Sequence, residues 1–229
     1  MDNLRPLSTT QGVLYGADGS ARFHMGSTSV LVSVNGPQSQ GLGMRDEQED
    51  RAILDISHIP ISGTAGVADK HMEECIRTTF ESAILLGYHP RTMIQVIAQT
   101  IKDDGGLLAA SINATTMALM DAGIPMTAIV AAVTCMVEKE TGAILVDQTA
   151  ESLERAKSIH TFAISSARGN SPDPNVLLLH SLGLFTESEL SHCQEAAVGA
   201  TDAIFAFMRK AVSKKIEKGH QQDGDMQED

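Results

Sequence analysis

The spacing of hydrophobic positions changes several times along the first half of the chain. Residues 21–37 (ARFHMGSTSVLVSVNGP) predict two strands that are joined at residues 26–28 and closed by the turn pair Gly36-Pro37. A polar stretch at 38–52 is expected to be a mobile surface loop, and residues 51–60 return to a strand pattern. Over residues 70–87 the apolar positions recur every three or four residues, which predicts an amphipathic helix ended before Pro90.

The second half of the chain begins with a strand pattern at residues 92–101 and a helix pattern at 106–123. This helix carries almost no charge before Met120, so we expect it to be buried nearly all round. The remaining pattern predicts a hairpin, a second pair of strands and one long helix with Thr186 as its N-cap, at residues 128–138 and 142–149, 158–166 and 175–183, and 186–218.

These elements predict an α+β fold in which mixed sheets pack with helices and a long helix closes the chain. We expect one domain over residues 1–218 and an acidic, disordered tail over 219–229. The composition is 42% hydrophobic but only 3% aromatic, with no Trp. Aliphatic side chains and Met must therefore fill the core.

The net charge of −12 argues against a chain that grips nucleic acid over its whole surface. One local basic patch, or a place in a larger basic assembly, remains compatible with it. The chain contains no apolar run of about 20 residues and begins without a secretory signal. Three scattered cysteines, Cys75, Cys135 and Cys193, favour a reducing compartment without disulfides, so we expect a soluble intracellular protein.

Motifs for metal and cofactor sites are missing from the sequence. It has no CxxC pair, no HxH or HExxH spacing, no phosphate-binding loop, no Rossmann glycine pattern and no G-x-S-x-G elbow. We therefore expect no cofactor and no metal. The histidines in or beside the predicted strands are expected to be hydrogen-bonded structural residues: His24, His58, His160 and His180.

One short segment, KDDGG at residues 102–106, has two interpretations. Asp103 and Asp104 could hold a divalent cation, and the start of the following helix could hold a phosphate. Alternatively, Asp104 caps the helix while Gly105 and Gly106 allow close contact between helix and sheet. The pattern alone favours the second interpretation.

Four lysines gather near the end of the last helix. They could touch RNA, but such a cluster more often lies in solvent and complements the helix dipole. They are Lys210, Lys214, Lys215 and Lys218.

Four segments resemble the RNase PH family in order and spacing, over about residues 4–215. They are DGSARFHMGSTSVLVSVNGP, CIRTTFESAILLGYHPRT, DDGGLLAASINATTMALMDAGIPM and GAILVDQTAESLE. Three shorter pieces, HPRT, DDGGLLAASINA and ALMDAGIPM, look like one RNase PH-like ring subunit of the eukaryotic RNA exosome.

This resemblance implies a single RNase PH-type domain of β-α-β-α topology. Six such subunits form a ring, together with RNA-binding cap subunits, and single-stranded RNA passes through its channel. The resemblance also implies a role in 3′-to-5′ RNA processing and degradation, including that of rRNA, in the nucleus, the nucleolus and the cytoplasm. Active members cleave RNA from its 3′ end with inorganic phosphate as the nucleophile.

The chain departs from active members in three segments. An Asp-Cys-Asp-like segment is replaced by IAQ at residues 97–99, a Thr-Arg-Thr segment by LLA at 107–109, and a phosphate-binding Arg-Thr pair by VAD near 67–69. Asp104 alone matches the acidic site. Loss of one donor from an oxyanion-type site costs on the order of 100-fold in rate. The resemblance therefore implies a non-catalytic, structural and RNA-guiding ring subunit.

Two alternatives stay open. The chain could keep a metal- or phosphate-dependent nuclease activity on single-stranded RNA or DNA, with Asp103 and Asp104 as its acidic site. It could also act outside the exosome as a homo-oligomer. If RNA binds the chain, the candidate contacts are Arg77 and Arg91, near the ends of the first predicted helix.

Overall fold

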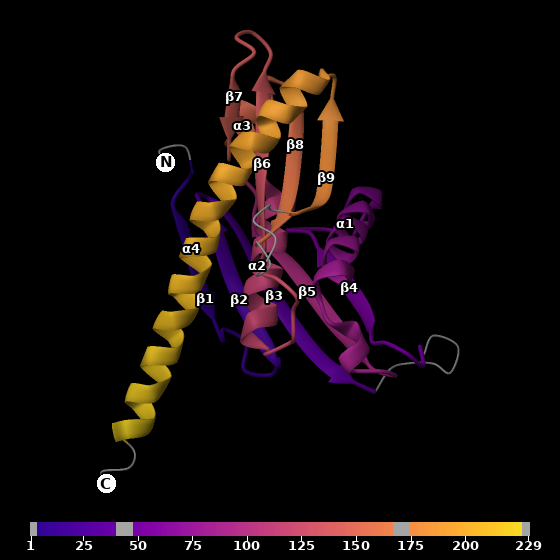
Figure 1. The fold of residues 1–229 in the computed structure, drawn as a ribbon, viewed down its shortest axis with the longest axis vertical. Coiled ribbons are helices and arrows are strands. Elements are labelled where there is room, and N and C mark those ends of the chain that lie inside the picture. Colours follow the sequence, from indigo (N-terminus) through magenta and orange to yellow (C-terminus); the bar gives the residue numbers. More distant parts are fainter. Residues whose placement is uncertain (1–3, 40–47, 167–174, 226–229) are drawn as a thin grey trace.

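A computed structural model describes residues 4–39, 48–166 and 175–225, with side chains through residue 217. The described part forms a five-stranded sheet, a four-stranded sheet and helices, so the predicted α+β class is confirmed (Figure 1). Its elements are β1 (Leu7–Gln11), β2 (Gly19–Met25), β3 (Thr28–Gln38), β4 (Ile53–Ile59), α1 (Val67–Ala83), η1 (Leu86–Tyr88), β5 (Met93–Lys102), α2 (Leu107–Asp121), β6 (Val130–Glu138), β7 (Ile144–Val146), α3 (Ala150–Leu153), β8 (Ala156–Ser165), β9 (Asn175–Gly183) and α4 (Glu187–Asp225).

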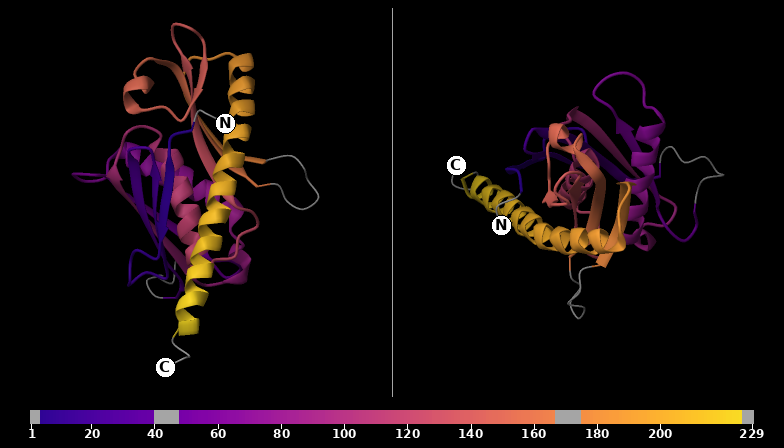
Figure 2. Two further views of the ribbon diagram at one scale, coloured as in Figure 1. Left: turned by 90° about the vertical axis from the view of Figure 1, so that its left-hand side faces the viewer. Right: turned by 90° about the horizontal axis from the view of Figure 1, so that it is seen from above.

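The two sheets are built on different topologies. The first has the strand order β1-β2-β3-β5-β4, antiparallel except for the parallel pair of β4 and β5. The second is wholly antiparallel, in the order β7-β6-β8-β9. Helix α1 packs on β4, and α4 runs obliquely along the second sheet, mainly against β6 (Figures 1 and 2).

Helix α2 lies at the centre of the molecule, in contact with β2 and β3 of the first sheet and with β6 of the second. Its residues from Ala109 to Leu119 are all buried, as the uncharged sequence predicted. Two polar side chains bind it to β6. The Asn113 side chain donates to the Ala132 carbonyl (2.8 Å) and accepts from the Ala132 N–H (2.7 Å), and the Thr116 hydroxyl donates to the Val130 carbonyl (2.8 Å).

The cysteines are buried, as expected. All three are free, and burial raises the pKa of the Cys135 thiol to about 12.

The expectation of hydrogen-bonded histidines is confirmed for two of the four strand histidines, His58 and His160. His160 is fully buried, with Nδ1 2.8 Å from the Ser181 hydroxyl and Nε2 3.0 Å from the Ser158 hydroxyl. His24 and His180 are half-buried, and neither side chain has a hydrogen bond within the described residues.

Several element boundaries differ from the sequence prediction. Strand β1 was missed because its polar LSTTQ sequence hides the alternation, and α3 was missed because it is only one turn long. The Gly36-Pro37 pair lies inside β3 at a ladder irregularity and does not close the strand. Helix α1 ends at Ala83, before the predicted residue 87, where the chain turns extended at Ile84.

The long last helix begins as predicted. The Glu189 N–H donates to the Thr186 hydroxyl (3.3 Å), and the Thr186 N–H donates to Glu189 Oε2 (2.7 Å). Hydrogen bonds from Lys157 and Thr186 lower the pKa of Glu189 to about 2. Helix α4 runs to Asp225, beyond the predicted residue 218, because no proline interrupts the segment.

The division into residues 1–218 and 219–229 stays a prediction. Most of the predicted loop at 38–52 lies outside the described residues. So does most of the segment 167–175, which is the predicted loop between the strands at 158–166 and 175–183. In the part of the chain that the structure covers, every helix is too short or too polar to span a membrane.

Close contact between β2 and α2 depends on Gly19. A Cβ at this position would lie 2.4 Å from the Ala122 backbone nitrogen and 2.5 Å from the Ala118 carbonyl oxygen. We expect Gly19→Ala to lower the free energy of unfolding by about 1–3 kcal/mol, because backbone atoms cannot move aside cheaply. Urea unfolding measures the change, with Gly16→Ala as the control, since nothing lies within 4 Å there. Equal midpoints for the two variants would contradict the expectation.

Candidate functional site

The two glycines of the KDDGG segment are required by the backbone. Gly105 and Gly106 have φ angles of 88° and 70°, in the left-handed region that favours glycine. A Cβ on Gly105 would lie 2.9 Å from both the Ala150 nitrogen and the Gln148 carbonyl oxygen. Gly105 therefore allows close contact with the segment that follows β7. The prediction that it allows close contact between helix and sheet was wrong.

The predicted cap was also wrong. Helix α2 has Gly106 as its N-cap and no side-chain cap, because the left-handed glycines turn Asp104 away from the first helical turn. The carboxylate that closes the turn belongs to Asp103, whose Oδ1 accepts from the Gly105 N–H at 3.0 Å.

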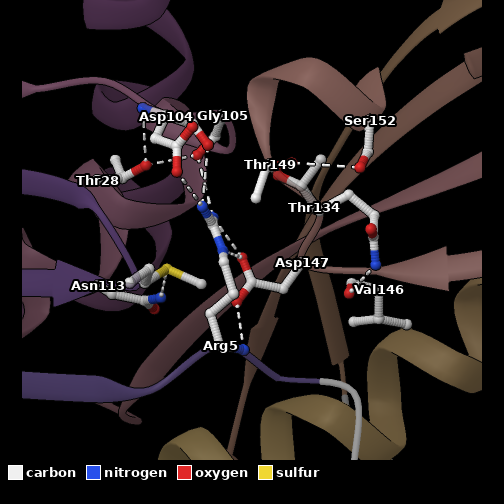
Figure 3. A network of polar contacts seen from close by, with 12 residues as sticks. Arg5, Thr28, Asp104, Gly105, Asn113, Thr134, Val146, Asp147, Thr149 and Ser152 are labelled. Atoms are coloured by element: carbon white, nitrogen blue, oxygen red, sulfur yellow. Dashed lines mark hydrogen bonds and ion pairs between the residues drawn. The ribbon is translucent and has the colours of Figure 1, made fainter. Parts of the chain in front are cut away.

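Arg5 holds this turn from the other end of the chain (Figure 3). Its guanidinium donates to the carbonyls of Asp104 (2.9 Å) and Gly105 (3.1 Å), and through Nε and Nη2 to Oδ1 of Asp147 (3.0 and 2.6 Å). The Arg5 N–H donates to Asp147 Oδ2 at 3.0 Å. The Thr28 hydroxyl completes the turn, donating to the Gly105 carbonyl (2.8 Å) and accepting from the Asp104 N–H (3.0 Å).

Asp147 is the buried member of this ion pair. Its side chain is 0% exposed, and its N–H donates to the Thr134 carbonyl at 2.7 Å. Its φ angle of 53° is one that Asp tolerates better than most residues. Sequence reasoning missed the pair because its members are 142 residues apart. One weak signal was an Asp directly after the short apolar strand ILV.

A cavity of about 300 Å³ opens beside the turn. Strand β4, the start of α1, the end of β5 and the start of α2 all contribute to it. Its lining residues are His58, Pro60, Ile61, Ser62, Asp69, Thr100, Asp103 and Leu107.

A hydrogen-bonded row of three side chains forms one side of this cavity. His58 Nδ1 lies 2.9 Å from Asp69 Oδ1, and His58 Nε2 lies 2.8 Å from the Thr100 hydroxyl. The N–H of Gly66, which donates to Asp69 Oδ2 at 2.8 Å, lowers the pKa of the Asp69 carboxyl, and His58 lowers it further. The expectation that His58 is a hydrogen-bonded structural residue is confirmed.

The cavity has the wrong charge for an anion. Its eight lining residues include two carboxylates, Asp69 and Asp103, and no Arg or Lys. Phosphate and an RNA backbone are both negative, so they need cationic donors to meet. Within the described ranges, no group of three His, Cys, Asp or Glu residues is arranged to hold a metal ion.

The structure brings together the three segments in which the chain departs from active RNase PH members. Asp69 and Leu107 both line the cavity, and the Gln99 side chain donates to the carbonyl of Pro60, another lining residue, at 3.2 Å. Asp103 also lines the cavity, whereas Asp104 does not. Oδ2 of Asp104 lies 3.9 Å from Arg5 Nη1.

The two candidate RNA contacts lie elsewhere, and neither lines the cavity. Arg77 is bound to Glu74 (Nε to Oε2, 3.0 Å) and to Glu81 (Nη1 to Oε1, 2.6 Å), and these carboxylates raise its pKa. The Arg91 side chain is 62% exposed, with Nη2 3.7 Å from Glu49 Oε1. RNA binding by these arginines stays a prediction.

The structure combines two sheets, a central helix between them and a DGG turn beside a small cavity. The sequence comparison assigns this combination to a class of protein. Residues 3–125 match the family model described as "3' exoribonuclease family, domain 1", and the chain belongs to this family, RNase PH.

Its relatives are exosome proteins. The chain is 33% identical to an Oryza sativa protein named "Exosome complex exonuclease RRP46 homolog", over 93% of each chain. It is 31% identical to the Saccharomyces cerevisiae "Exosome complex component RRP46", over 90% of this chain and 94% of that protein. The crystal structure of rice Rrp46 superposes with a TM-score of 0.83 at 32% identity, covering 91% of this chain and 94% of that one.

The ion pair of Arg5 and Asp147 gives a stability prediction. Arg5→Met leaves the Asp147 charge buried without its partner, so we expect a loss of about 3 kcal/mol in the free energy of unfolding. The double variant Arg5→Met/Asp147→Asn should lose less than the sum of the single losses, by about 1–3 kcal/mol.

Urea unfolding of the single and double variants measures both quantities. The control is Arg209→Met, which removes an exposed arginine from α4. Strictly additive losses of the free energy of unfolding would show that the two side chains act independently. They would contradict a stabilising ion pair between Arg5 and Asp147.

Proposed function

We propose that this chain is a non-catalytic subunit of the RNA exosome core ring, with a structural and RNA-guiding role in 3′-to-5′ RNA processing and degradation. The names and the near-complete coverage of its relatives support the assembly. The observation that carries the proposed lack of catalysis is the cavity beside the turn, where the lining residues that the structure describes include Asp69 and Asp103 but neither Arg nor Lys.

The chemistry explains why this lining supports the proposal that the chain does not catalyse phosphorolysis. Inorganic phosphate must attack a phosphodiester, so two anions have to be held in contact while negative charge develops on the leaving oxygen. Each missing donor costs on the order of 100-fold in rate. Two carboxylates at the same place add repulsion, and the Leu107 side chain offers no hydrogen bond.

An exposed apolar edge supports the structural role. Strand β9 is the last strand of its sheet, and four apolar side chains on it or directly after it are exposed to solvent. Their exposed fractions are 45% for Leu179, 55% for Leu182, 83% for Leu184 and 40% for Phe185. An apolar edge of this kind is a surface that a neighbouring subunit covers. In the proposed ring the neighbours are other RNase PH-like subunits, together with cap subunits.

The path of RNA and the location of the complex belong to the same proposal. Single-stranded RNA passes through the ring channel, with Arg77 and Arg91 as the proposed contacts. Because Arg77 is already paired with Glu74 and Glu81, phosphate must compete with two carboxylates there. The complex resides in the nucleus, the nucleolus and the cytoplasm.

Activity is tested directly on the purified full chain. We expect no shortening of a 5′-labelled single-stranded RNA with or without phosphate and Mg²⁺, because the cavity lacks cationic donors. Gel analysis of the products over time measures it. Asp103→Asn and Asp104→Asn test the alternative, since the rice relative is named an exonuclease. Shortening that needs phosphate or Mg²⁺ and disappears in Asp103→Asn would overturn the non-catalytic proposal.

Assembly is tested separately. Leu179→Glu/Leu182→Glu places two charges on the edge of β9, so we expect it to prevent co-purification with the other ring subunits when all are expressed together. The control, Tyr15→Glu/Val67→Glu, changes two other exposed apolar side chains and should assemble normally. Circular dichroism checks that both variants fold. Normal assembly of the β9 variant would exclude this edge as the interface.

A further inference from the structure

A second cavity, of about 560 Å³, lies between β1 and the C-terminal half of α4. Among the described residues, it shares no lining residue with the cavity beside the KDDGG turn. We call it the basic groove, because three of its lining residues are lysines. Its lining residues are Leu7, Ser8, Thr9, Thr10, Gln11, Phe207, Lys210, Ala211, Lys214 and Lys215.

One wall of the basic groove is an open sheet edge. Strand β1 is the terminal strand of the first sheet and, within the described residues, it pairs with β2 alone. Hydrogen bonds from Gly26 N–H to the Pro6 carbonyl (2.9 Å) and from Gly12 N–H to the Ser20 carbonyl (2.8 Å) fix which residues face β2.

The other residues of β1 face outward. In an antiparallel ladder alternate residues form the hydrogen bonds, so Pro6 and Gly12 set the phase. The backbone N–H and C=O groups of Leu7, Thr9 and Gln11 therefore point away from β2. Three residues at a spacing of two give the donor and acceptor pattern to which another strand adds.

The opposite wall carries positive charge on a chain whose net charge is −12. Lys210 and Lys214 are exposed, and neither has an ion pair among the side chains that the structure describes. Lys215 is paired with Asp121 near the end of the groove. Two lysine charges are thus available to a ligand in the groove.

The floor between these walls is apolar. It is formed by Leu7, Phe207 and Ala211, which are all half-buried. The Phe207 ring packs edge-on against Phe23 with 6.0 Å between centroids, so the floor is anchored in the core.

We propose that the basic groove binds an extended, acidic peptide segment of another protein, which adds to β1 as a strand. The segment pairs its backbone with Leu7, Thr9 and Gln11, places apolar side chains on the floor, and sets carboxylates against Lys210 and Lys214. This binding site is separate from the cavity beside the turn and does not depend on ring membership.

The backbone edge favours a peptide over RNA. A peptide strand offers donors and acceptors in alternation, whereas an RNA backbone presents phosphate oxygens that the carbonyls of Leu7, Thr9 and Gln11 would repel. Among its described lining residues, the groove has a single aromatic ring, Phe207, which is half-buried and packs edge-on against Phe23, so it offers no row of rings on which successive bases would stack. Lysines also protect sheet edges from unwanted pairing, and in that case no peptide binds.

Fluorescence anisotropy with the full chain tests the proposal. The probe is a fluorescein-labelled peptide, Glu-Val-Glu-Val-Glu-Val-Glu, and its counterpart has Lys in place of Glu. We expect the acidic peptide to bind, and Lys210→Glu/Lys214→Glu to weaken it about tenfold or more. The control Lys102→Glu/Lys139→Glu makes the same change in charge at exposed lysines elsewhere and should leave binding unchanged.

A backbone variant separates strand addition from simple charge attraction. Thr9→Pro removes an outward N–H without removing a backbone hydrogen bond to β2, and proline is tolerated on an edge strand. It also removes the hydrogen bond from the Thr9 hydroxyl to the Arg22 carbonyl in β2 (3.2 Å), so Thr9→Val, which removes only that bond, is the matched control. We expect Thr9→Pro to weaken the acidic peptide about fivefold or more, with an unchanged circular dichroism spectrum.

Four results would overturn the proposal. The first is no binding of the acidic peptide, which would leave the lysines as edge protection. The second is equal binding of the basic peptide. The third is binding of single-stranded oligoadenylate, lost in Lys210→Glu/Lys214→Glu, without binding of the peptide. The fourth is self-association of the chain in sedimentation that the same variant abolishes, which would make a second copy the occupant.

Discussion

The ion pair between Arg5 and Asp147 is the constraint on which the rest of the structure depends. A single guanidinium binds the N-terminal segment, the KDDGG turn and the loop after β7 to one another. These three segments come from both sheets and from the start of the central helix. The ion pair is therefore one buried point that sets the relative placement of the two sheets, together with the packing of α2 between them. The carboxylate of Asp147 is removed from water with its charge compensated by Arg5.

This arrangement explains how the turn is held without any contribution from catalysis. The glycines are kept by their backbone conformation and by the space beside Ala150, and Thr28 and Arg5 bind the carbonyls of the turn. None of these roles involves a substrate. The cavity next to the turn is free to change its lining, and in this chain the positions that face it are Asp69, Asp103 and Leu107. The residues that hold the turn and the residues that line the cavity are thus only one or two positions apart in the sequence.

The sequence predicted what depends on local pattern. The uncharged run from Gly106 to Leu119 predicted a buried helix, and the segment NVLLLHSLG, read as the second of a pair of strands, predicted β9 to the residue. It could not predict what depends on distant partners. Strand β1 is mostly polar and exists because β2 pairs with it, and the partner of Arg5 lies 142 residues away. The prediction that Asp104 caps the helix was wrong because two consecutive glycines in the left-handed region change the direction of the chain. The identity of a single residue does not predict that backbone conformation.

The amide of Asn113 has a consequence for how the centre of the molecule is organised. A helix whose buried side chains are small and apolar could rotate about its axis or shift along it with little change in energy, because it would meet similar apolar neighbours in each position. The Asn113 side chain imitates a peptide group and engages both the N–H and the C=O of Ala132. Any rotation or translation of α2 breaks both interactions at once in a buried environment. The Asn113 amide, together with the Thr116 hydroxyl on the Val130 carbonyl, therefore fixes the angular and axial position of α2.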